Sequence, residues 1–588
     1  MKTRNVLLVY PKFDTSFWSF SYTLQYIGKK SSMPPLGLLT LGNMFPNGYN
    51  VKLVDMNVEP LTHRHVQWAD LICTSTMIVQ RRSLADVVTM ARQAGKPIVA
   101  GGPHPTSYWE EMPEIDYLLL GEVEEIFSGF LEDLESGIAK RIYIPKERPA
   151  ITRTPLPRYD LINMRQYGSM LLQFSRGCPF DCEFCDITKI YGRIPRTKTN
   201  EQILAEFQLL YDLGHRGSLF LVDDNFIGNR RDALRFLNAC ITWQKERGYP
   251  FNVYTEASMN LVEYPELMHN MVQAGFTSVF VGIETPTPEA LIVTKKKQNI
   301  DKNDPYYLLH AVHTLQKNGL EVMGGFIIGL DGDLPNVFDL HIEFIKQAAI
   351  PIAMEGLLTA LKDTDLYIRL KKEGRLIGDT TGTSIDTHLN FKPQMPEHIL
   401  IKGYIRVLNA IYGHKLEDYF ERCWTFLKCL DRSKSPVTAS TPLTVQETLR
   451  FAFSTLRQIL CSDESTSYIR FLGRVLTEKP SMIRDALILG AKGHHLRKVT
   501  QQVTAVESFK SFLAHELSSM KEEIAQCAKE GNARISLYVR KKITRLKSEY
   551  QTIHEDFRHS AQESLDAFMC SLNAYLQEHD RSSVIFSP

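Results

Sequence analysis

The stretch MLLQFSRGCPFDCEFCDITKIYG, residues 170–192, joins an apolar run to three closely spaced cysteines. Cys178, Cys182 and Cys185 follow the pattern Cys-x3-Cys-x2-Cys. Structural zinc is normally held by four ligands, often from two Cys-x2-Cys pairs, and this sequence has no second pair. Three thiolates can instead hold three irons of a [4Fe-4S] cluster and leave the fourth iron open to substrate. The spacing therefore predicts an iron–sulfur cluster with one open iron.

Around this motif, apolar runs alternate with helix-like segments. After MLLQF come runs at residues 217–228, 250–260, 277–286, 320–330 and 350–361. Such alternation predicts a whole or partial (β/α) barrel, in which chemistry is placed at the carboxyl ends of the strands. The three cysteines follow the first of these strands, which is where a barrel would put a reactive cluster.

The chain before the motif shows a similar alternation from Asn5 to about Phe127. Strands that are apolar throughout predict a parallel sheet covered on both faces, in a doubly wound (Rossmann-like) α/β domain. Its ligand should lie outside the carboxyl ends of the strands, at residues 11–20, 74–77 and 101–107. No G-x-G-x-x-G turn follows the first strand, which argues against a dinucleotide.

Three domains are expected, at residues 1–147, 148–393 and 394–588. A proline-bearing stretch at 145–160 suits an extended connector. Beyond Gln394 helical periodicity replaces the strand signals and predicts a helical C-terminal domain. In that domain Thr444 and Glu447 fit a capping box, and an apolar helical face follows, formed by Leu449, Phe453, Leu456 and Leu460.

Composition limits the kind of partner. The 588 residues include 68 Lys plus Arg against 67 Asp plus Glu, so the excess positive charge of a nucleic-acid-binding protein is missing and a small-molecule substrate is expected. Ten scattered cysteines and the absence of a secretory signal predict a cytoplasmic protein. No run approaches the roughly 18 apolar residues of a transmembrane segment.

Several other features carry little functional signal. A basic stretch, formed by Arg540, Lys541, Lys542, Arg545 and Lys547 beside Ile543 and Leu546, is interpreted first as the solvated face of a helix. Peripheral docking at an anionic membrane is the less favoured alternative. Cys423 and Cys429 are expected to be buried thiols rather than ligands of a second cluster. His494 and His495 suggest no particular role.

At Cys178, Cys182, Phe184 and Cys185 the sequence resembles the radical S-adenosylmethionine (SAM) superfamily. The resemblance implies that the open iron binds SAM, and that an electron from an external low-potential donor leads to its cleavage into a 5'-deoxyadenosyl radical. It also suggests further SAM contacts on later strands. These are Asp223, Asp224 and Asn225 for the amine, Glu256 and Glu284 for ribose or methionyl groups, and Gly325 and Gly329 beside the adenine; helix capping and strand bulges are the plainer alternatives for such residues.

The N-terminal segments VLLVYP, LVDMN, VAGGPHPT and LLLGEVEEIF resemble the cobalamin-binding domain fused to many radical SAM enzymes. Thr74, Ser75, Gly101 and Gly102 are then expected to cradle the corrin or its nucleotide tail. Many such domains carry Asp-x-His-x-x-Gly after the first strand, whereas this chain offers Asp14 without a histidine. His104 is the nearest substitute for a cobalt ligand, although a loop histidine more often only forms hydrogen bonds.

Longer segments, among them FWSFSYTLQYIGKKSSMPPLGLLT and VDDNFIGNRR, are similar to the subgroup that contains a hopanoid methylase. The resemblance implies a cobalamin-dependent radical SAM methyltransferase that acts on an unactivated carbon of a small, possibly lipid-like molecule. One alternative keeps both cofactors but forms or contracts a ring without net methylation. A cluster-based redox sensor is the alternative from another class.

Overall fold

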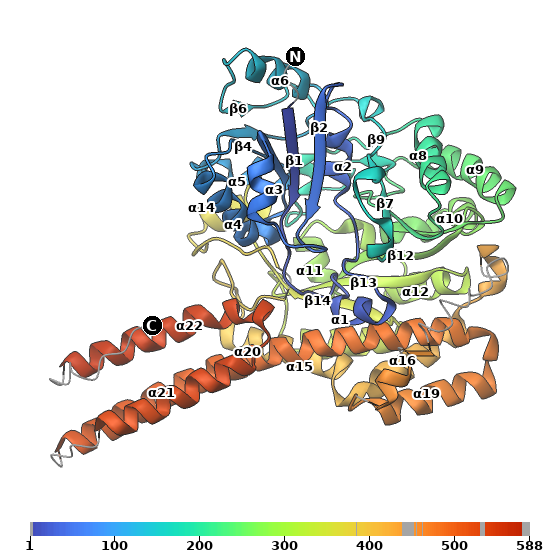
Figure 1. Ribbon diagram of the computed structural model, residues 1–588. Coiled ribbons are helices and arrows are strands. Elements are labelled where there is room, and N and C mark those ends of the chain that lie inside the picture. The colour runs from blue at the N-terminus through green and yellow to red at the C-terminus, as the bar shows by residue number, and fades with distance from the viewer. Residues whose placement is uncertain are drawn as a thin grey trace.

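The first of two parallel sheets lies near the N-terminus of the chain, whose computed structural model describes residues 4–383, 385–437, 452–453, 455–460, 462–529 and 535–578. Its strands run in the order β2-β1-β3-β4-β5-β6 (Figure 1). They are β1 (Arg4–Tyr10), β2 (Tyr49–Asp55), β3 (Leu71–Ser75), β4 (Ile98–Gly101), β5 (Tyr117–Leu119) and β6 (Ile142–Tyr143). The strand order reverses between β1 and β3, so the ligand site of such a fold is expected at their carboxyl ends.

Helices cover both faces of this sheet, which explains why its strands are apolar throughout. Leu7 and Val9 pack into one hydrophobic core and Val6 and Leu8 into another, on opposite faces of β1. The covering helices are α2 (Leu36–Gly42), α3 (His63–Trp68), α4 (Arg81–Gln93), α5 (Pro103–Tyr108) and α6 (Phe127–Glu135). The predicted doubly wound α/β fold is confirmed.

The second sheet has six parallel strands whose spatial order follows the chain, β7-β10-β11-β12-β13-β14. They are β7 (Met170–Leu172), β10 (Gly217–Leu221), β11 (Phe251–Glu256), β12 (Phe276–Glu284), β13 (Glu321–Ile328) and β14 (Ile352–Leu357). Between them lie α8 (Asn200–Asp212), α9 (Arg230–Glu246), α10 (Pro265–Gln273), α12 (Tyr307–Lys317) and α13 (Val337–Gln347). Within the described ranges β7 and β14 do not pair with each other, so the barrel is partial rather than closed.

The stretch between the two sheets is anchored rather than extended. Two short 3-10 turns, Ile151–Arg153 and Tyr159–Leu161, bury the side chains of Ile151 and Tyr159 almost completely. The Tyr159 hydroxyl donates a hydrogen bond of 2.5 Å to the carbonyl of Leu171 in β7. The sequence failed to show this because one buried tyrosine and one buried isoleucine leave no periodic pattern.

Helices dominate the chain after β14, as predicted. They include α14 (Asp365–Lys372), α15 (Glu397–Tyr412), α16 (Glu417–Cys429), α19 (Ser465–Glu478), α20 (Ile483–Lys529), α21 (Ile535–Thr552) and α22 (Glu555–Glu578). The 47-residue α20 runs along one side of the molecule, and α21 and α22 extend beside its C-terminal half (Figure 1). α15 packs against α13 and β14, and α20 contacts α15 and the short α1 (Ser21–Leu24). No helix of the described ranges is long and apolar enough to cross a bilayer.

The apolar face predicted near residue 450 can be followed only in part. Thr444, Glu447 and Leu449 lie outside the described residues. Phe453, Leu456 and Leu460 each leave more than half of the side chain exposed. The sequence therefore identified helical spacing there without locating a packing partner.

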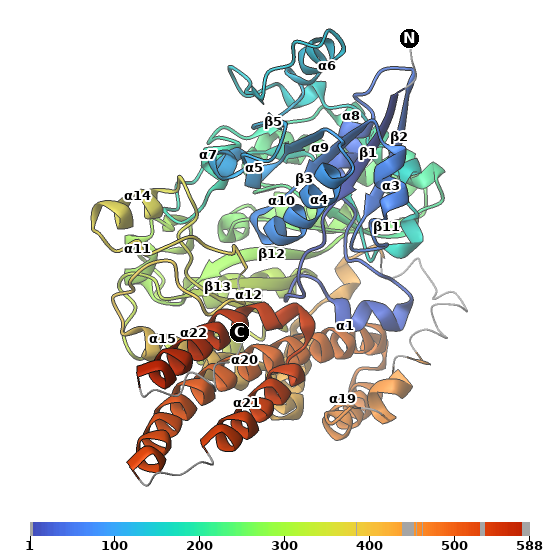
Figure 2. The same ribbon diagram turned by 60° about the vertical axis from the view of Figure 1, so that its left-hand side comes forward.

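Loops at the carboxyl ends of the two sheets contact each other, and Figure 2 shows β1, β2 and β3 above β12 and β13. Glu122 follows β5 and forms an ion pair of 2.7 Å with Arg176, which follows β7. Tyr108, after β4, accepts a hydrogen bond of 3.2 Å from the amide N–H of Lys362, after β14. The ends at which each fold places its ligand therefore meet.

Candidate active site

The cysteine loop begins where β7 gives way to a short hairpin between β8 (Ser175–Arg176) and β9 (Arg196–Thr197). Gly177 has φ of 100°, and a Cβ on it would lie 2.9 Å from the carbonyl oxygen of Gly192. Only glycine fits this turn without strain. The Cys178 amide N–H then donates to the carbonyl of Gly192, 3.2 Å away, which closes the loop on its own end.

The three cysteine thiols are all free, and Cys182 is buried while Cys178 and Cys185 are partly covered. Burial raises the pKa of the Cys178 and Cys185 thiols, so a cation is needed to stabilise their thiolates there. Within the described part of the chain, no group of three or more His, Cys, Asp or Glu side chains could hold one metal ion. A [4Fe-4S] cluster has no need of such convergence, because each thiolate binds a different iron, and this donor set fits it.

The polar run after β10 supports the cysteine loop. Both carboxylate oxygens of the fully buried Asp223 are used, one by the Phe174 N–H at 2.8 Å and one by the Ser175 hydroxyl at 2.6 Å. Asp224 accepts from the Gly177 N–H at 2.7 Å. Asp223 therefore braces the backbone before the cysteine loop, and its predicted contact with SAM remains a prediction.

Asn225, the third residue of this run, links the first cysteine to the next strand. Its side-chain amide donates to the Ser258 hydroxyl at 3.1 Å and lies 3.9 Å from the Cys178 sulfur. Its oxygen accepts from the Ser258 N–H at 3.2 Å. This amide thus lies beside Cys178, one of the three predicted cluster ligands.

Buried acidic groups gather next to the cysteines. Burial, with the neighbouring acidic groups, raises the pKa of Glu256 to about 8, and burial raises the pKa of Asp223 to about 7 and of Asp224 to about 6. No side chain of the described residues donates a hydrogen bond to Glu256. A cationic ligand would relieve this crowding of negative charge, and SAM carries both a sulfonium and an ammonium group. The acidic residues present therefore fit SAM.

Glu284 ends β12 with φ of 65° and is buried in an ion pair with Lys296, at 2.7 Å. Burial would lower the pKa of Lys296, but Glu284 and the Cys182 thiolate together raise it, so the ammonium stays charged. The Lys296 nitrogen lies 6.0 Å from the ring centre of Phe184. Glu284 is thus paired with a lysine near the cysteine loop, and its predicted contact with SAM remains a prediction.

Lys296 and Gln298 were not identified from the sequence. The Gln298 amide donates toward the Cys182 sulfur at 3.5 Å. Both residues belong to the run TKKKQNI, which has the composition of an exposed loop. The one available signal was its position just after β12, on the same edge as the cysteines.

The two predicted glycines, Gly325 in β13 and Gly329 just after it, each have a contact within the protein. A Cβ on Gly325 would lie 2.9 Å from the Phe280 ring. Gly329 has φ of 97°, and its N–H donates to Asp333 at 2.8 Å. Their predicted place beside adenine remains a prediction, and the contacts give each glycine a packing reason of its own.

A second polar cradle lies at the carboxyl ends of β3 and β4, next to the switch point of the first sheet. Gly102 has φ of 94°, and a Cβ there would lie 2.8 Å from the Ser75 hydroxyl and 2.9 Å from the Thr76 amide nitrogen. The neighbouring Gly101 lies close to the carbonyl of Leu119. The Thr74 hydroxyl donates to the carbonyl of Val99, so this side chain links β3 to β4.

Two buried polar atoms at this cradle lack a hydrogen-bond partner among the described residues, the Thr76 hydroxyl and Nδ1 of His104. Burial and Arg81 lower the pKa of His104 to about 4, so its ring is neutral at pH 7. Unpaired buried polar atoms beside these closely packed glycines fit the amide-rich edge and nucleotide tail of cobalamin. Thr76 was not among the predicted residues, although the predicted loop included it.

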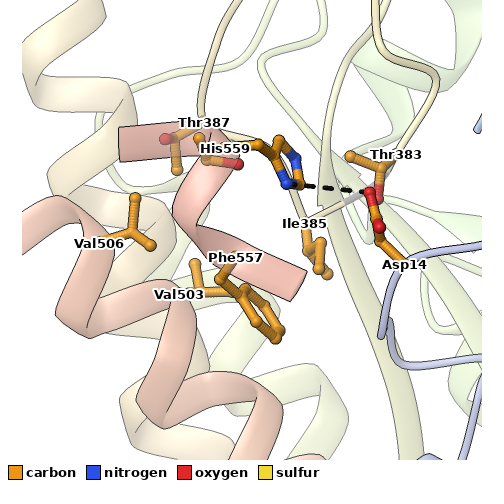
Figure 3. A pocket seen from close by; sticks show the side chains of 9 residues that line it. Asp14, Thr383, Ile385, Thr387, Val503, Val506, Phe557 and His559 are labelled. Atoms are coloured by element: carbon orange, nitrogen blue, oxygen red, sulfur yellow. Dashed lines mark ion pairs between the residues drawn. The ribbon is translucent and has the colours of Figure 1, made fainter. Parts of the chain in front are cut away.

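Asp14 follows β1, and the structure brings a histidine to it from the far end of the chain. His559 of α22 lies 3.8 Å from the Asp14 carboxylate across a small pocket, which is also lined by Thr383, Ile385 and Phe557 (Figure 3). The sequence could not show this pairing, because 545 positions separate the two residues.

Comparisons with known protein families follow the same division of the chain. A model of the radical SAM superfamily matches residues 172–345, and a model of the B12 binding domain matches residues 29–131. A domain of unknown function matches residues 364–508. The B12-binding model spans β2 to β5 of the first sheet, and the radical SAM model spans β10 to β13 of the second.

Two curated relatives match 88% and 64% of the chain. An uncharacterised methyltransferase of Synechocystis sp. is 39% identical over 88% of this chain and 96% of its own length. Hopanoid C-2 methylase of Rhodopseudomonas palustris is 37% identical over 64% of this chain and 72% of its own length. The solved radical SAM methyltransferase TsrM from Kitasatospora setae, with cobalamin and [4Fe-4S] cluster bound, has a TM-score of 0.50 at 14% identity, and the match covers 83% of this chain and 99% of TsrM.

These relatives favour methyl transfer over the ring-forming alternative and over a cluster-based sensor. The cofactors of the protein are a [4Fe-4S] cluster, SAM and cobalamin. The chain belongs to the cobalamin-binding radical SAM methyltransferases, in the group that includes hopanoid C-2 methylase.

Proposed function

We propose that this methyltransferase acts on an unactivated carbon of an apolar, polycyclic small molecule of the hopanoid kind. The observation that carries the proposal is the contact between the two sheets, because it brings the cysteine loop and the Thr76–His104 cradle to one junction. The 37% identity with hopanoid C-2 methylase supports the substrate class.

The proposed roles of the site residues follow from which of their polar atoms are not already used in hydrogen bonds within the protein. Cys178, Cys182 and Cys185 hold the cluster, Asp224 and Glu256 hold the cationic end of SAM, and Lys296 limits the charge beside them. Thr76, Gly102 and His104 hold cobalamin. When bound, these cofactors supply a hydrogen-abstracting radical and a transferable methyl group, which side-chain acids and bases cannot provide.

Aromatic side chains near the junction support an apolar substrate. The rings of Trp18 and Phe280 lie 4.6 Å apart, one from the loop after β1 and one from β12. Phe220 and Tyr254 stack at 4.5 Å on adjacent strands of the barrel. Trp18, Phe280 and Tyr254 are only partly buried, so they can contact a flat apolar molecule and exclude water from it.

The electron must come from outside the chain in this proposal. Cys423 is buried, and burial raises the pKa of its thiol to about 12, while Cys429 is half-buried, so the structure offers no second cluster at these residues. An external low-potential carrier is therefore the proposed electron donor. All cysteines of the described part of the chain are free, which supports action in the reducing cytoplasm.

Contact with a bilayer would depend on charge alone. On α21 Arg540, Lys541 and Lys547 are exposed, whereas Ile543 and Leu546 are buried within the protein. The basic stretch thus lies on the solvated face of a helix, and its neighbours Ile543 and Leu546 pack within the protein and are not free to insert. Sedimentation with anionic and neutral liposomes tests this, and tight binding to neutral vesicles would contradict it.

The direct test compares lipid extracts of cells with and without the gene after growth on methionine with a deuterated methyl group. A gene-dependent product one methylene heavier than its precursor, with the deuterated methyl, is expected. Cells expressing the Cys182→Ala variant control for the presence of the protein. A gene-dependent product without added carbon would contradict the proposal.

A further inference from the structure

Glu183 lies inside the cysteine motif, between Cys182 and Cys185, and every polar group of this residue is engaged. Its amide N–H donates to the carbonyl of Thr294 at 3.1 Å, and its carbonyl accepts from the Leu366 N–H at 2.8 Å. Its side chain is only 7% exposed. A buried carboxylate in this position needs a cation, since an unpaired one is strongly unfavourable.

The cation comes from α14, far along the chain. Arg369 donates from Nη2 to one Glu183 oxygen at 2.7 Å and from Nε to the other at 3.1 Å. Such a two-pronged pairing fixes direction as well as distance, which a lysine cannot do. The residues are 186 positions apart, and Arg369 belongs to the segment matched by the domain of unknown function.

Arg369 is itself held in place by a third residue. Its Nη1 donates to Asp331 at 2.7 Å, and Asp331 also accepts two hydrogen bonds from Arg375, at 2.8 and 2.9 Å. Asp331 is buried beside the end of β13. Turning the guanidinium away from Glu183 would therefore also break its bond to Asp331, which would then be left to Arg375 alone.

The first turn of α14 holds the same loop at another point. Asp365 pairs with Lys189 at 2.8 Å and with Lys295 at 3.0 Å. Lys189 belongs to α7 (Ile187–Ile190), which starts two residues after Cys185. The short helix α14 thus pairs with Glu183 inside the cysteine motif and with Lys189 just after its last cysteine.

We propose that Arg369 is a positioning residue for the cluster, acting through Glu183 to set both its retention and its midpoint potential. Retention follows from geometry, because the pair fixes the backbone between two cluster ligands. The potential follows from charge, because reduction adds an electron next to a carboxylate that, among the described residues, is ion-paired by Arg369 alone. This assigns a role to the start of the unassigned C-terminal segment.

The test uses full-length protein reconstituted anaerobically, with Arg369→Gln compared to wild type. Cluster loss to an iron chelator and the midpoint potential from an EPR-monitored titration are measured, and neither needs the substrate. Loss about 10–100-fold faster than in wild type and a more negative potential are expected. Arg406→Gln is the matched control, since Arg406 makes an exposed ion pair with Asp339 in α13.

Two further variants separate charge from packing. Glu183→Gln/Arg369→Gln removes both charges, so its potential should return toward that of wild type while cluster loss stays fast. Arg369→Lys keeps the positive charge but not the two-pronged pairing. This variant should keep the wild-type midpoint potential but lose the cluster faster than wild type. This variant also serves if Arg369→Gln fails to fold.

The proposal would be overturned if a folded Arg369→Gln protein lost its cluster at the wild-type rate and had the wild-type midpoint potential. Faster loss with the same potential in all three variants would also overturn it, because packing alone would then explain the effect. Neither result would bear on the proposed substrate. In the same way, failure to methylate a hopanoid-like molecule would not bear on the proposed role of Arg369 and Glu183.

Discussion

Gly102 and Gly95 both adopt positive φ, 94° and 62°, but only Gly102 lies against other atoms. A Cβ on Gly102 would meet the Ser75 hydroxyl and both backbone polar atoms of Thr76 at 3.0 Å or less, whereas one on Gly95 would meet nothing within 4 Å. Gly102→Ala should therefore displace the Thr76 loop and lose cobalamin, as measured by cobalt per chain.

Gly95→Ala controls for backbone strain alone. It should lower stability by about 1–2 kcal/mol and leave cobalamin content unchanged. Equal cobalamin content in folded Gly102→Ala and Gly95→Ala proteins would show that the β3–β4 cradle does not hold the cofactor.

Cys182 is one of the three proposed ligands of the cluster. Cys182→Ala takes away one of three iron ligands and should abolish the cluster absorbance and all SAM cleavage, while cobalamin still binds at the other sheet. Cys570→Ala, which changes an exposed thiol of α22, should do neither. Formation of 5'-deoxyadenosine by Cys182→Ala would refute the assignment.

At the scale of single residues, the sequence predicted the cysteines well and their surroundings less well. The three thiols follow a spacing that few other kinds of site share. Asp223 and Asp224 are adjacent in the sequence, and only the fold shows that the two carboxylate oxygens of Asp223 accept hydrogen bonds from Phe174 and Ser175. Lys296 was missed because pairing with Glu284 depends on a bulge between Gly282 and Glu284, which leaves no trace in the sequence.

At the scale of elements, Glu122 links the two sheets. It pairs at 2.7 Å with both Arg176 and Arg196 and is almost wholly buried. Glu122→Gln leaves the two guanidinium groups short of a partner and should lower the free energy of unfolding by about 3 kcal/mol. Urea midpoints and proteolysis of residues 145–160 would measure the loss.

Glu125→Gln is the matched control for that change. Glu125 pairs with Arg153 at the surface, where both side chains are well exposed, so its loss should cost less than about 1 kcal/mol. Equal effects of the two substitutions would contradict a structural role for the Glu122 ion pairs.

Strands were easier to predict than their connections. Most strands of the two sheets are apolar because helices cover both faces, and that burial is visible in the sequence. Strands β6, β8 and β9 have two residues each, too few for any pattern. The anchored stretch at 145–160 and the ion pairs of α14 depend on residues far apart in sequence, which local propensity cannot report.

At the scale of the whole molecule, α20 joins the N-terminal loop to the helical domain through His495. Its Nε2–H donates to the carbonyl of Ser16 at 2.9 Å, and burial lowers its pKa to about 4 from an ordinary value of 6.5. The folded state binds the proton of His495 more weakly than the unfolded state does. The contribution of the buried, neutral ring to the free energy of unfolding is therefore complete above pH 6.5 and is lost as the pH falls toward 4.

His495→Gln should therefore be less sensitive to acid than wild type. Between pH 7 and pH 5, wild type should lose about 2 kcal/mol that the variant, lacking the titrating ring, keeps. Urea midpoints of both proteins at the two pH values provide the comparison. A parallel decline of the two proteins would contradict the protonation of His495.

The central claim is that one chain holds a cluster with an open iron and a cobalamin, facing each other where the two sheets meet. The most direct measurement is EPR spectroscopy of the reduced, anaerobically reconstituted full-length protein, with and without SAM, together with iron and cobalt analysis. We expect one [4Fe-4S] cluster and one cobalamin per chain, and a cluster signal that changes when SAM binds. A protein without a four-iron cluster, or with a cluster signal that SAM leaves unchanged, would contradict the account.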